Sequence, residues 1–223
     1  MNFSSNGLIF QLSEEDRVRL QVICQPVELS AGQHLCLAGA NDADQVYFLT
    51  GACVTLWVQP EKQTPLAVGL LGAEGAVGLG MALGQSTTHM RFEVQRAGTA
   101  WRAPSTLLQK LLRAHPNVLW VVARYLWQVT HDMADMTASV QYDDVQTRLA
   151  SWLVLCAQRS NSLHLNLTHD HLARMLGVRR VSITLAATTL RDAGLLTYKR
   201  GTVDILDLNG LILQAHAKPY KAA

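Results

Sequence analysis

The sequence predicts an α+β protein in which a small antiparallel β-barrel is followed by a long helix and then by helices and a hairpin. Alternating segments punctuated by glycine fill much of the first 115 residues, and this spacing is typical of small antiparallel barrels. A heptad-like apolar repeat comes next. The segment 168–206 then combines two short amphipathic helices with an alternating hairpin. We expect three parts, with the boundaries 1–115, 116–141 and 142–223.

The composition indicates folded material with room for two modest domains, since 49% of the 223 residues are hydrophobic and 16% are charged. The net charge of +2 is unevenly distributed. Residues 1–139 carry 9 Lys and Arg against 11 Asp and Glu, whereas residues 140–223 carry 10 against 6. A basic C-terminal part beside a mildly acidic N-terminal part fits a nucleic-acid-binding unit attached to something else.

The cysteines and the hydropathy predict a reduced, cytoplasmic protein with no membrane partner. No close cysteine pair indicates a zinc site or a disulfide framework, and the four cysteines are Cys24, Cys36, Cys53 and Cys156. No signal peptide opens the chain. The most apolar stretch, 118–127, contains Arg124 and is too short to span a bilayer.

Two short helices are predicted on either side of Gly177, which can adopt a left-handed conformation without strain. The positions expected to face inward are Leu172, Ala173, Leu176, Val178, Ile183 and Ala186. The positions expected to face outward on the second helix are Arg179, Arg180, Val181, Ser182, Thr184 and Thr188. Two adjacent arginines at the start of a recognition helix suit phosphate and guanine contacts. A plain helical hairpin with a solvated arginine pair is the alternative.

A hairpin follows these helices and favours the DNA-binding interpretation. The second helix ends near Gly194, and residues 196–206 read as two alternating strands around Arg200 and Gly201. Such a hairpin is the wing of a winged helix-turn-helix. We expect Lys199 and Arg200, near its tip, to contact a phosphate backbone.

A long helix is predicted from Pro116, because proline is tolerated in the first turn. Its apolar residues follow a 3-4-3-4 spacing, which indicates a dimer seam. The seam residues are Leu119, Val122, Leu126, Val129, Met133, Met136 and Val140. The alternative is a core helix packed on its own barrel, and Trp120, Val121 and Trp127 are expected to make that contact.

The barrel segment resembles the cyclic-nucleotide-binding barrel through its glycines and strand residues: Gly32, Leu35, Gly39, Asp42, Asp44, Val46, Gly51 and Leu56. With the helix-turn-helix and the wing, roughly residues 10–210 resemble the Crp/Fnr family of bacterial transcription regulators. The resemblance implies a jelly-roll sensor barrel, a dimerisation helix and a winged helix-turn-helix. It also implies a parallel homodimer that binds palindromic double-stranded DNA, with RNA polymerase as a further partner.

The resemblance also implies which residues read DNA. Arg180 matches the guanine-reading arginine of the family, whereas Val181 and Leu185 stand where the family often has glutamate and arginine. The target half-site should therefore differ, with Val181 against a thymine methyl. The expected phosphate contacts are Arg179, Ser182, His169, Lys199 and Arg200.

The barrel departs from the family's phosphate-binding cassette, so we do not expect cyclic AMP to bind. Leu79, after Gly78, replaces the ribose-binding glutamate, and Phe92 replaces the phosphate-binding serine; only Arg91 carries over. A nucleotide left with unsatisfied polar groups would bind weakly. No cofactor is predicted, although a metabolite, or a haem held by His34, His89 or a cysteine, is the alternative barrel ligand. No catalytic motif indicates an enzyme.

Overall fold

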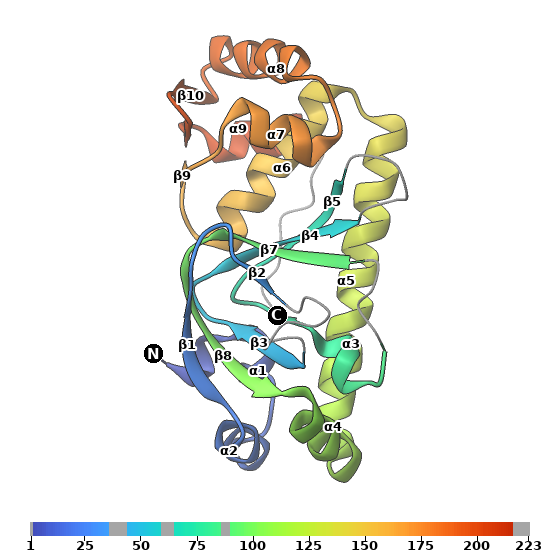
Figure 1. The fold of residues 1–223 in the computed structure, drawn as a ribbon. Coiled ribbons are helices and arrows are strands. Elements are labelled where there is room, and N and C mark those ends of the chain that lie inside the picture. The colour runs from blue at the N-terminus through green and yellow to red at the C-terminus, as the bar shows by residue number, and fades with distance from the viewer. Residues whose placement is uncertain (1, 36–43, 59–64, 86–89, 216–223) are drawn as a thin grey trace.

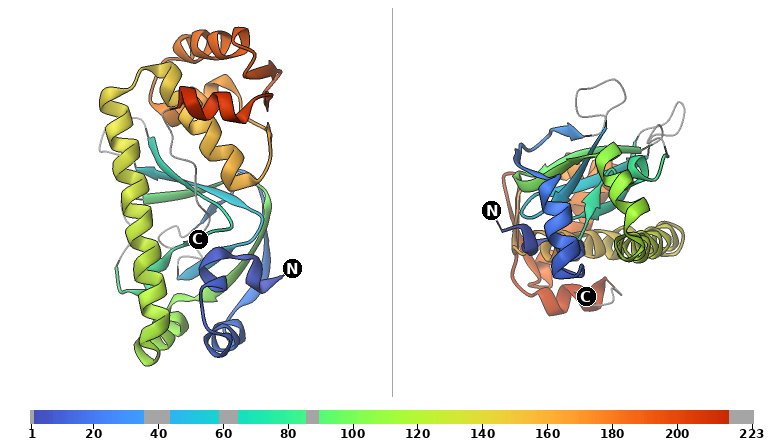
Figure 2. Two further views of the ribbon diagram at one scale, coloured as in Figure 1. Left: turned by 180° about the vertical axis from the view of Figure 1, so that it is seen from behind. Right: turned by 90° about the horizontal axis from the view of Figure 1, so that it is seen from below.

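The structure is a computed structural model that describes residues 2–35, 44–58, 65–85 and 90–215. Two antiparallel sheets form the N-terminal part, the helix α5 runs along their side, and the C-terminal elements cover one end (Figure 1). Seen from behind and from below, α5 stays at the edge of the molecule, with one flank turned outward (Figure 2).

The N-terminal sheets have four strands each. The first has the order β1-β8-β3-β6, with bounds Gln25–Leu29, Gly98–Pro104, Gln45–Leu49 and Ala76–Val77. The second has the order β2-β7-β4-β5, with bounds His34–Leu35, Met90–Arg96, Cys53–Val58 and Leu66–Leu71. Both are antiparallel throughout. The predicted barrel is therefore a jelly roll of two sheets rather than one closed cylinder.

The expected strands on either side of Gly51 are present, but β3 and β4 do not pair with each other. β3 pairs with β6 and β8, whereas β4 pairs with β5 and β7. The turn at Gly51 therefore carries the chain from one sheet to the other. Cys36, Gly39, Asp42 and His89, which the sequence singled out, lie outside the described residues.

Short helices flank the sheets. Their bounds are Phe3–Ser5 for the 3₁₀ helix η1, Gly7–Phe10 for α1, Glu14–Val22 for α2, Leu79–Ala82 for α3 and Ser105–Ala114 for α4. Ser13 caps α2, because its hydroxyl accepts a hydrogen bond from the amide of Asp16 at 3.1 Å. Three acidic residues in the first turn complement the helix dipole: Glu14, Glu15 and Asp16.

The helix α5, Pro116–Tyr142, begins at the expected proline and joins the two halves of the molecule. The amide of Ala76 donates a hydrogen bond to the Tyr125 hydroxyl at 3.2 Å. A Cβ at Gly75 would lie 2.0 Å from that hydroxyl oxygen. A glycine is thus required where α5 approaches the first sheet.

The C-terminal part contains the predicted helices and hairpin. Its elements are α6 Val145–Ser160, β9 His164–Leu165, α7 His169–Leu176, α8 Arg180–Asp192, β10 Leu196–Lys199, β11 Thr202–Ile205 and α9 Leu208–Gln214. The hairpin gains a third strand that the sequence did not indicate, with the order β10-β11-β9. β9 is too short, at two residues, to show an alternating pattern.

The C-terminal helices share a hydrophobic core with the second N-terminal sheet. Trp57, Ala67 and Leu70 of that sheet belong to the same buried cluster as Leu153 of α6 and Leu172 of α7. Burial of apolar side chains is the main favourable contribution to the free energy of folding. The C-terminal helices are therefore packed on the sheets rather than tethered by a free linker.

Two arginines add polar contacts at this junction. The guanidinium of Arg159 on α6 lies 3.0 Å from a carboxylate oxygen of Glu74 and 3.0 Å from one of Asp132 on α5. Its side chain is only 4% exposed. Arg174 on α7 lies over the Trp57 ring at 5.1 Å and pairs with Glu93 at 3.5 Å. Three separate segments therefore meet at Arg159: α6, the turn that contains Glu74, and α5.

The described cysteines are buried and unpaired, as expected of inert thiols. Burial raises the pKa of Cys24 to about 12, that of Cys53 to about 11 and that of Cys156 to about 12. Within the described part of the chain, no helix has the length and apolar character needed to cross a membrane.

Replacing Arg159 with methionine is expected to lower the free energy of unfolding by about 3 kcal/mol, measured by urea denaturation. The substitution leaves the Glu74 carboxylate, whose side chain is 17% exposed, without its guanidinium partner. Replacing both residues with methionine should recover much of that loss, because the unpaired buried charge is then removed.

Arg191→Met serves as the matched control, because Arg191 pairs with Asp192 at 2.8 Å on the surface. Its side chain is 55% exposed, so the loss should stay below about 1 kcal/mol. Equal losses for the two single variants would contradict the structural role of Arg159.

Candidate nucleic-acid interface

The turn between α7 and α8 has the geometry of a helix-turn-helix. Thr168 caps α7 by accepting a hydrogen bond from the His171 amide at 3.1 Å. Gly177 ends it in the left-handed conformation, at φ +63°. A Cβ at Gly177 would also approach Leu66 to 3.0 Å. The left-handed backbone therefore favours glycine here, and a Cβ would in addition force the Leu66 side chain to shift slightly.

The predicted inward face of this motif is buried. Ala173 is 7% exposed, Ile183 0% and Ala186 6%, and Val178 packs at the edge of the same cluster. The small side chains at 173 and 186 let the two helices approach closely. The burial of this face directs the opposite face of α8 to the surface.

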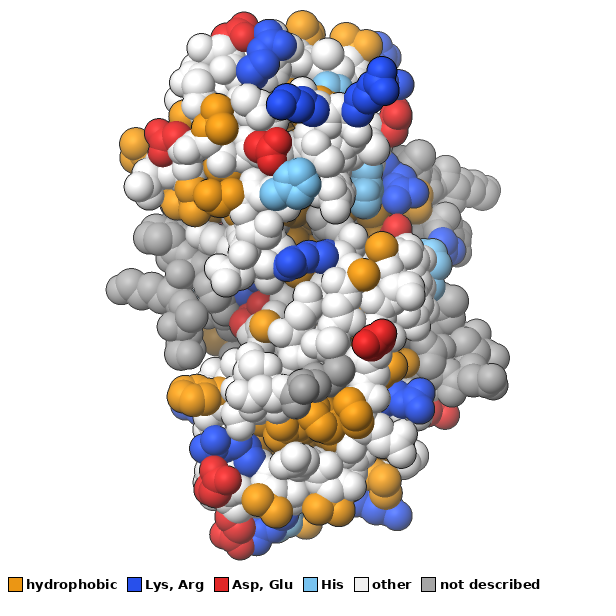
Figure 3. Space-filling model, turned by 90° about the vertical axis from the view of Figure 1, so that its left-hand side faces the viewer, with side chains coloured by type: hydrophobic (Ala, Val, Ile, Leu, Met, Phe, Trp, Pro, Cys, Tyr) orange, Lys and Arg blue, Asp and Glu red, His pale blue; other side chains and the backbone are white. Residues whose placement is uncertain are grey.

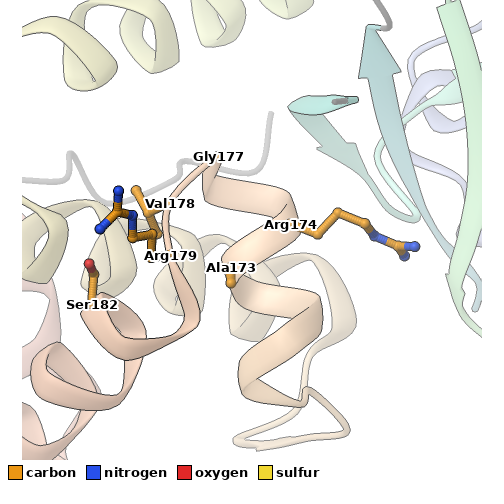
Figure 4. A pocket seen from close by; sticks show the side chains of 6 residues that line it. All are labelled: Ala173, Arg174, Gly177, Val178, Arg179 and Ser182. Atoms are coloured by element: carbon orange, nitrogen blue, oxygen red, sulfur yellow. The ribbon is translucent and has the colours of Figure 1, made fainter. Parts of the chain in front are cut away.

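The predicted outward residues lie on that surface. Val181 is 67% exposed, the Arg180 side chain is 65% exposed, and Arg179 and Thr184 are also exposed. Ser182 and Thr188 are half-buried. Figure 4 shows Ser182 beside Arg179 in a hollow at the turn, while Arg174 points away from them towards the strands. Leu185, at 65% exposure, belongs to the same face.

Arg180 has a carboxylate beside it. Its guanidinium lies 3.4 Å from a carboxylate oxygen of Asp170, whose side chain is also exposed. Such an exposed pair contributes little to stability. The pair places the guanidinium near the start of α8. At the same residue, the hydroxyl of Thr184 donates a hydrogen bond to the Arg180 carbonyl at 3.1 Å.

His169 lies at the joint between the helices and the wing. Its ring is 4.0 Å from that of Tyr198 on β10, and Nδ1 is hydrogen-bonded to the Thr184 hydroxyl at 3.1 Å. Desolvation, reinforced by the positive charge of Arg180, lowers the pKa of His169. A half-buried, neutral ring fits the role of a spacer between the two elements better than the phosphate contact predicted from the sequence.

The wing turns where the sequence predicts it. Arg200 and Gly201 both have positive φ, at 24° and 90°, between strands β10 and β11. Lys199 and Arg200 are exposed. Figure 3 shows several Lys and Arg side chains, with Asp and Glu side chains among them, at the end of the molecule formed by these C-terminal elements. The helix α8 and the wing therefore present positive charge together.

The barrel residues suggested as ligand contacts differ in exposure and surroundings. Gly78 has φ +84° and begins α3, and Leu79 is 3% exposed in the core next to α4 and α5. Arg91 is exposed on β7, whereas Phe92 is 6% exposed in a different apolar cluster. The described residues contain no group of three or more His, Cys, Asp and Glu that could hold a metal ion.

The predicted dimer seam is correct as a pattern but wrong in the face it presents. Val122 is 1% exposed, and Leu126, Val129 and Met136 pack on the chain's own cores. Met133 is half-buried, and only Leu119 and Val140 are exposed. Apolar residues occur on both sides of this helix, so spacing alone could not tell which side met the sheets.

The expectation that two tryptophans of α5 contact the barrel is also wrong. Trp120 and Trp127, expected on the barrel, are 69% and 66% exposed, and only Val121 of that group is buried, at 7%. Trp120, Ala123, Trp127, Thr130 and Ala134 follow the same 3-4-3-4 spacing on the outer flank. We call these five residues the outer flank of α5; four of them are exposed and Ala123 is half-buried.

Comparison with known proteins agrees with this geometry. A family profile of the Crp-like helix-turn-helix domain matches residues 147–213. A Crp/Fnr-family transcriptional regulator from Eubacterium rectale matches with a TM-score of 0.72 and 16% identity, over 94% of this chain and 98% of that chain. One from Thermus thermophilus gives 0.69 and 22%, over 86% and 99%. Curated proteins give no match.

A third solved structure, the c-di-GMP-responsive global regulator of Xanthomonas campestris, has a TM-score of 0.69 at 16% identity, over 86% of this chain and 99% of that chain. The fold and the site together define a chain whose C-terminal part is a helix-turn-helix domain. Residues 147–213 belong to the Crp-like helix-turn-helix domains, and the whole chain has the Crp/Fnr fold. The resemblance seen in the sequence is confirmed.

Acidification is expected to lower the stability of the folded protein through two histidines of this site, His169 and His171. Desolvation lowers the pKa of His169 and His171 below the usual 6.5, with further lowering by Arg180 and Arg174 respectively. Below pH 6.5 the unfolded chain therefore binds more protons than the folded protein. The contribution of the two neutral histidines to the free energy of unfolding is complete above that pH and is lost as the pH falls through the folded pKa values. Thermal melts at pH 7.5 and 5.5 should show a smaller fall for His169→Gln/His171→Gln than for the wild type. Equal falls would contradict the assignment.

Proposed function

We propose that this protein is a dimeric, sequence-specific regulator that reads a palindromic DNA site with α8 and contacts phosphates with the wing. The observation that carries the proposal is that Arg180 on α8 and Lys199 and Arg200 on the wing are all exposed, while His169 joins α8 to the wing through Thr184 and Tyr198. In a two-fold dimer, two recognition helices enter successive major grooves about 34 Å apart. Action in the cytoplasm and contact with RNA polymerase follow from the resemblance as parts of the same proposal.

The roles of the basic residues differ. Arg180 can donate two hydrogen bonds to O6 and N7 of a guanine, which makes its contribution depend on the base. Arg179, Lys199 and Arg200 are placed to contact phosphates, whose recognition positions the protein and carries no sequence information. Ser182 lies in the hollow beside Arg179, where its hydroxyl could donate to the same phosphate.

Arg180→Ala is expected to cost about 1–3 kcal/mol at one base position, whereas Lys199→Ala should weaken binding to all sequences alike. The binding site is first selected from a random DNA pool, and affinities for the selected site and for single-base variants are then measured by fluorescence anisotropy at fixed salt. Equal losses on selected and random DNA for Arg180→Ala would exclude the assigned base contact.

The dimer is proposed to form through the outer flank of α5. Trp120 and Trp127 lie one heptad apart on this surface, opposite the residues that pack on the sheets. Large aromatic side chains of this kind dominate the energetics of interfaces. The parallel arrangement places both copies of α8 at the same end of the dimer, as a palindrome requires.

Trp120→Asp/Trp127→Asp is expected to raise the dimer dissociation constant at least a hundredfold, because each buried tryptophan is worth about 2 kcal/mol or more at an interface. Sedimentation velocity over a concentration series measures it. Leu213→Asp on α9, at 78% exposure, provides a matched control that should remain dimeric. A monomeric wild type, or a double variant that dimerises as well as the control, would contradict the proposal.

Gating by a small molecule is the second candidate, and the shared core favours it. A ligand that moves Trp57 or Leu70 would act directly on the helices that carry α8, because these side chains lie in one cluster. Cyclic AMP is not the proposed ligand, since Leu79 and Phe92 are buried in apolar clusters. A metabolite or a redox cofactor remains the alternative occupant.

A further inference from the structure

The centre of the exposed face of α8 is apolar. A helix advances about 100° per residue, so the buried Ile183 and Leu190 define the inward direction. Val181 and Leu185 then lie on the opposite side, and they are 67% and 65% exposed. The side chains that point straight out of the motif are thus a valine and a leucine rather than charged groups.

Single exposed apolar residues are common on protein surfaces and require no explanation. Here two of them are four residues apart on one helical face, and Arg180 and Thr184 flank them. The β-branched Val181 is restricted at χ1, so its methyl groups have a fixed direction. The pair forms a short apolar stripe on the surface proposed to enter the major groove.

The major groove offers an apolar partner for such a stripe. Among the four unmodified bases, only thymine presents a methyl group there, at C5. A 5-methylcytosine carries the same group at the same atom. Neither Val181 nor Leu185 can donate or accept a side-chain hydrogen bond, so base discrimination at these positions depends on apolar contact.

We propose that Val181 and Leu185 read C5-methyl groups of pyrimidines at two positions of each half-site, beside the guanine read by Arg180. The inference rests on the proposed DNA-binding function and adds the chemistry of the sequence that is read. Four residues of helix correspond to about 6 Å along its axis, or roughly two base-pair steps. Both methyl groups therefore belong to one half-site.

The test begins with a site selected from a random DNA pool, in which each thymine is replaced in turn by deoxyuridine. The replacement removes only the methyl group. At two positions of the half-site, affinity should fall about fourfold, equivalent to about 0.8 kcal/mol for one buried methyl group. Deoxyuridine elsewhere should have no effect.

A second arm separates the two sources of the methyl group. Cytosine is placed at each of the two positions, with and without its C5-methyl. The methylated base should bind about fourfold more tightly than the unmethylated one. Equal affinities for the two cytosines would overturn the equivalence of thymine and 5-methylcytosine.

Alanine variants connect each residue to its position. Val181→Ala should abolish the deoxyuridine effect at one position and Leu185→Ala at the other. Leu213→Ala on α9 removes a similarly exposed apolar side chain and should leave both effects intact. Because both residues of the stripe are about two-thirds exposed, the variants are expected to fold.

The outcomes separate the two levels of the hypothesis. If no sequence is enriched from the pool, the proposed DNA-binding function fails. If a site is enriched but no thymine in it responds to deoxyuridine, reading of methyl groups is overturned while DNA recognition stands. Variants that weaken binding to all sequences equally, with the deoxyuridine effects unchanged, would likewise overturn it.

Discussion

The buried guanidinium of Arg159 is the interaction on which the arrangement of the molecule depends. A positive charge is costly to remove from water unless it is paired, and here two carboxylates lie at 3.0 Å. Those carboxylates belong to different segments, the turn at Glu74 and the helix α5, while Arg159 itself belongs to α6. Moving α6 away would leave both carboxylates without their guanidinium, and moving either other segment would leave the buried guanidinium with a single carboxylate.

This constraint determines which way the helix-turn-helix faces. α6 is held against the sheets, and α7 follows it, with Arg174 on the Trp57 ring and Gly177 in contact with Leu66. α8 then lies on the far side of α7, at the end of the molecule (Figure 1). Because α6 and α7 are packed on the sheets, the outer face of α8, which is proposed to read DNA, is left exposed.

Local signals in the sequence were enough to predict α5, the helix-turn-helix and the wing hairpin, because turns and periodicity act over a few residues, but they did not indicate the two-residue strand β9. Gly177, Gly201 and the start of α5 at Pro116 were recognised in this way. The face that α5 presents was predicted wrongly, since Val122 and Trp127 are equally apolar and only tertiary packing distinguishes them. The Arg159 cluster, which joins residues far apart in the chain, left no local pattern to recognise.

The core shared between the sheets and α6–α7 has a consequence for synthesis of the chain. Trp57 and Leu70 leave the ribosome long before α6 and α7, the helices that pack on their sheet. At roughly 5–20 residues per second, the interval is on the order of ten seconds. During it, part of the second sheet has no cover, so the nascent protein presents an apolar surface for chaperones until α7 is made.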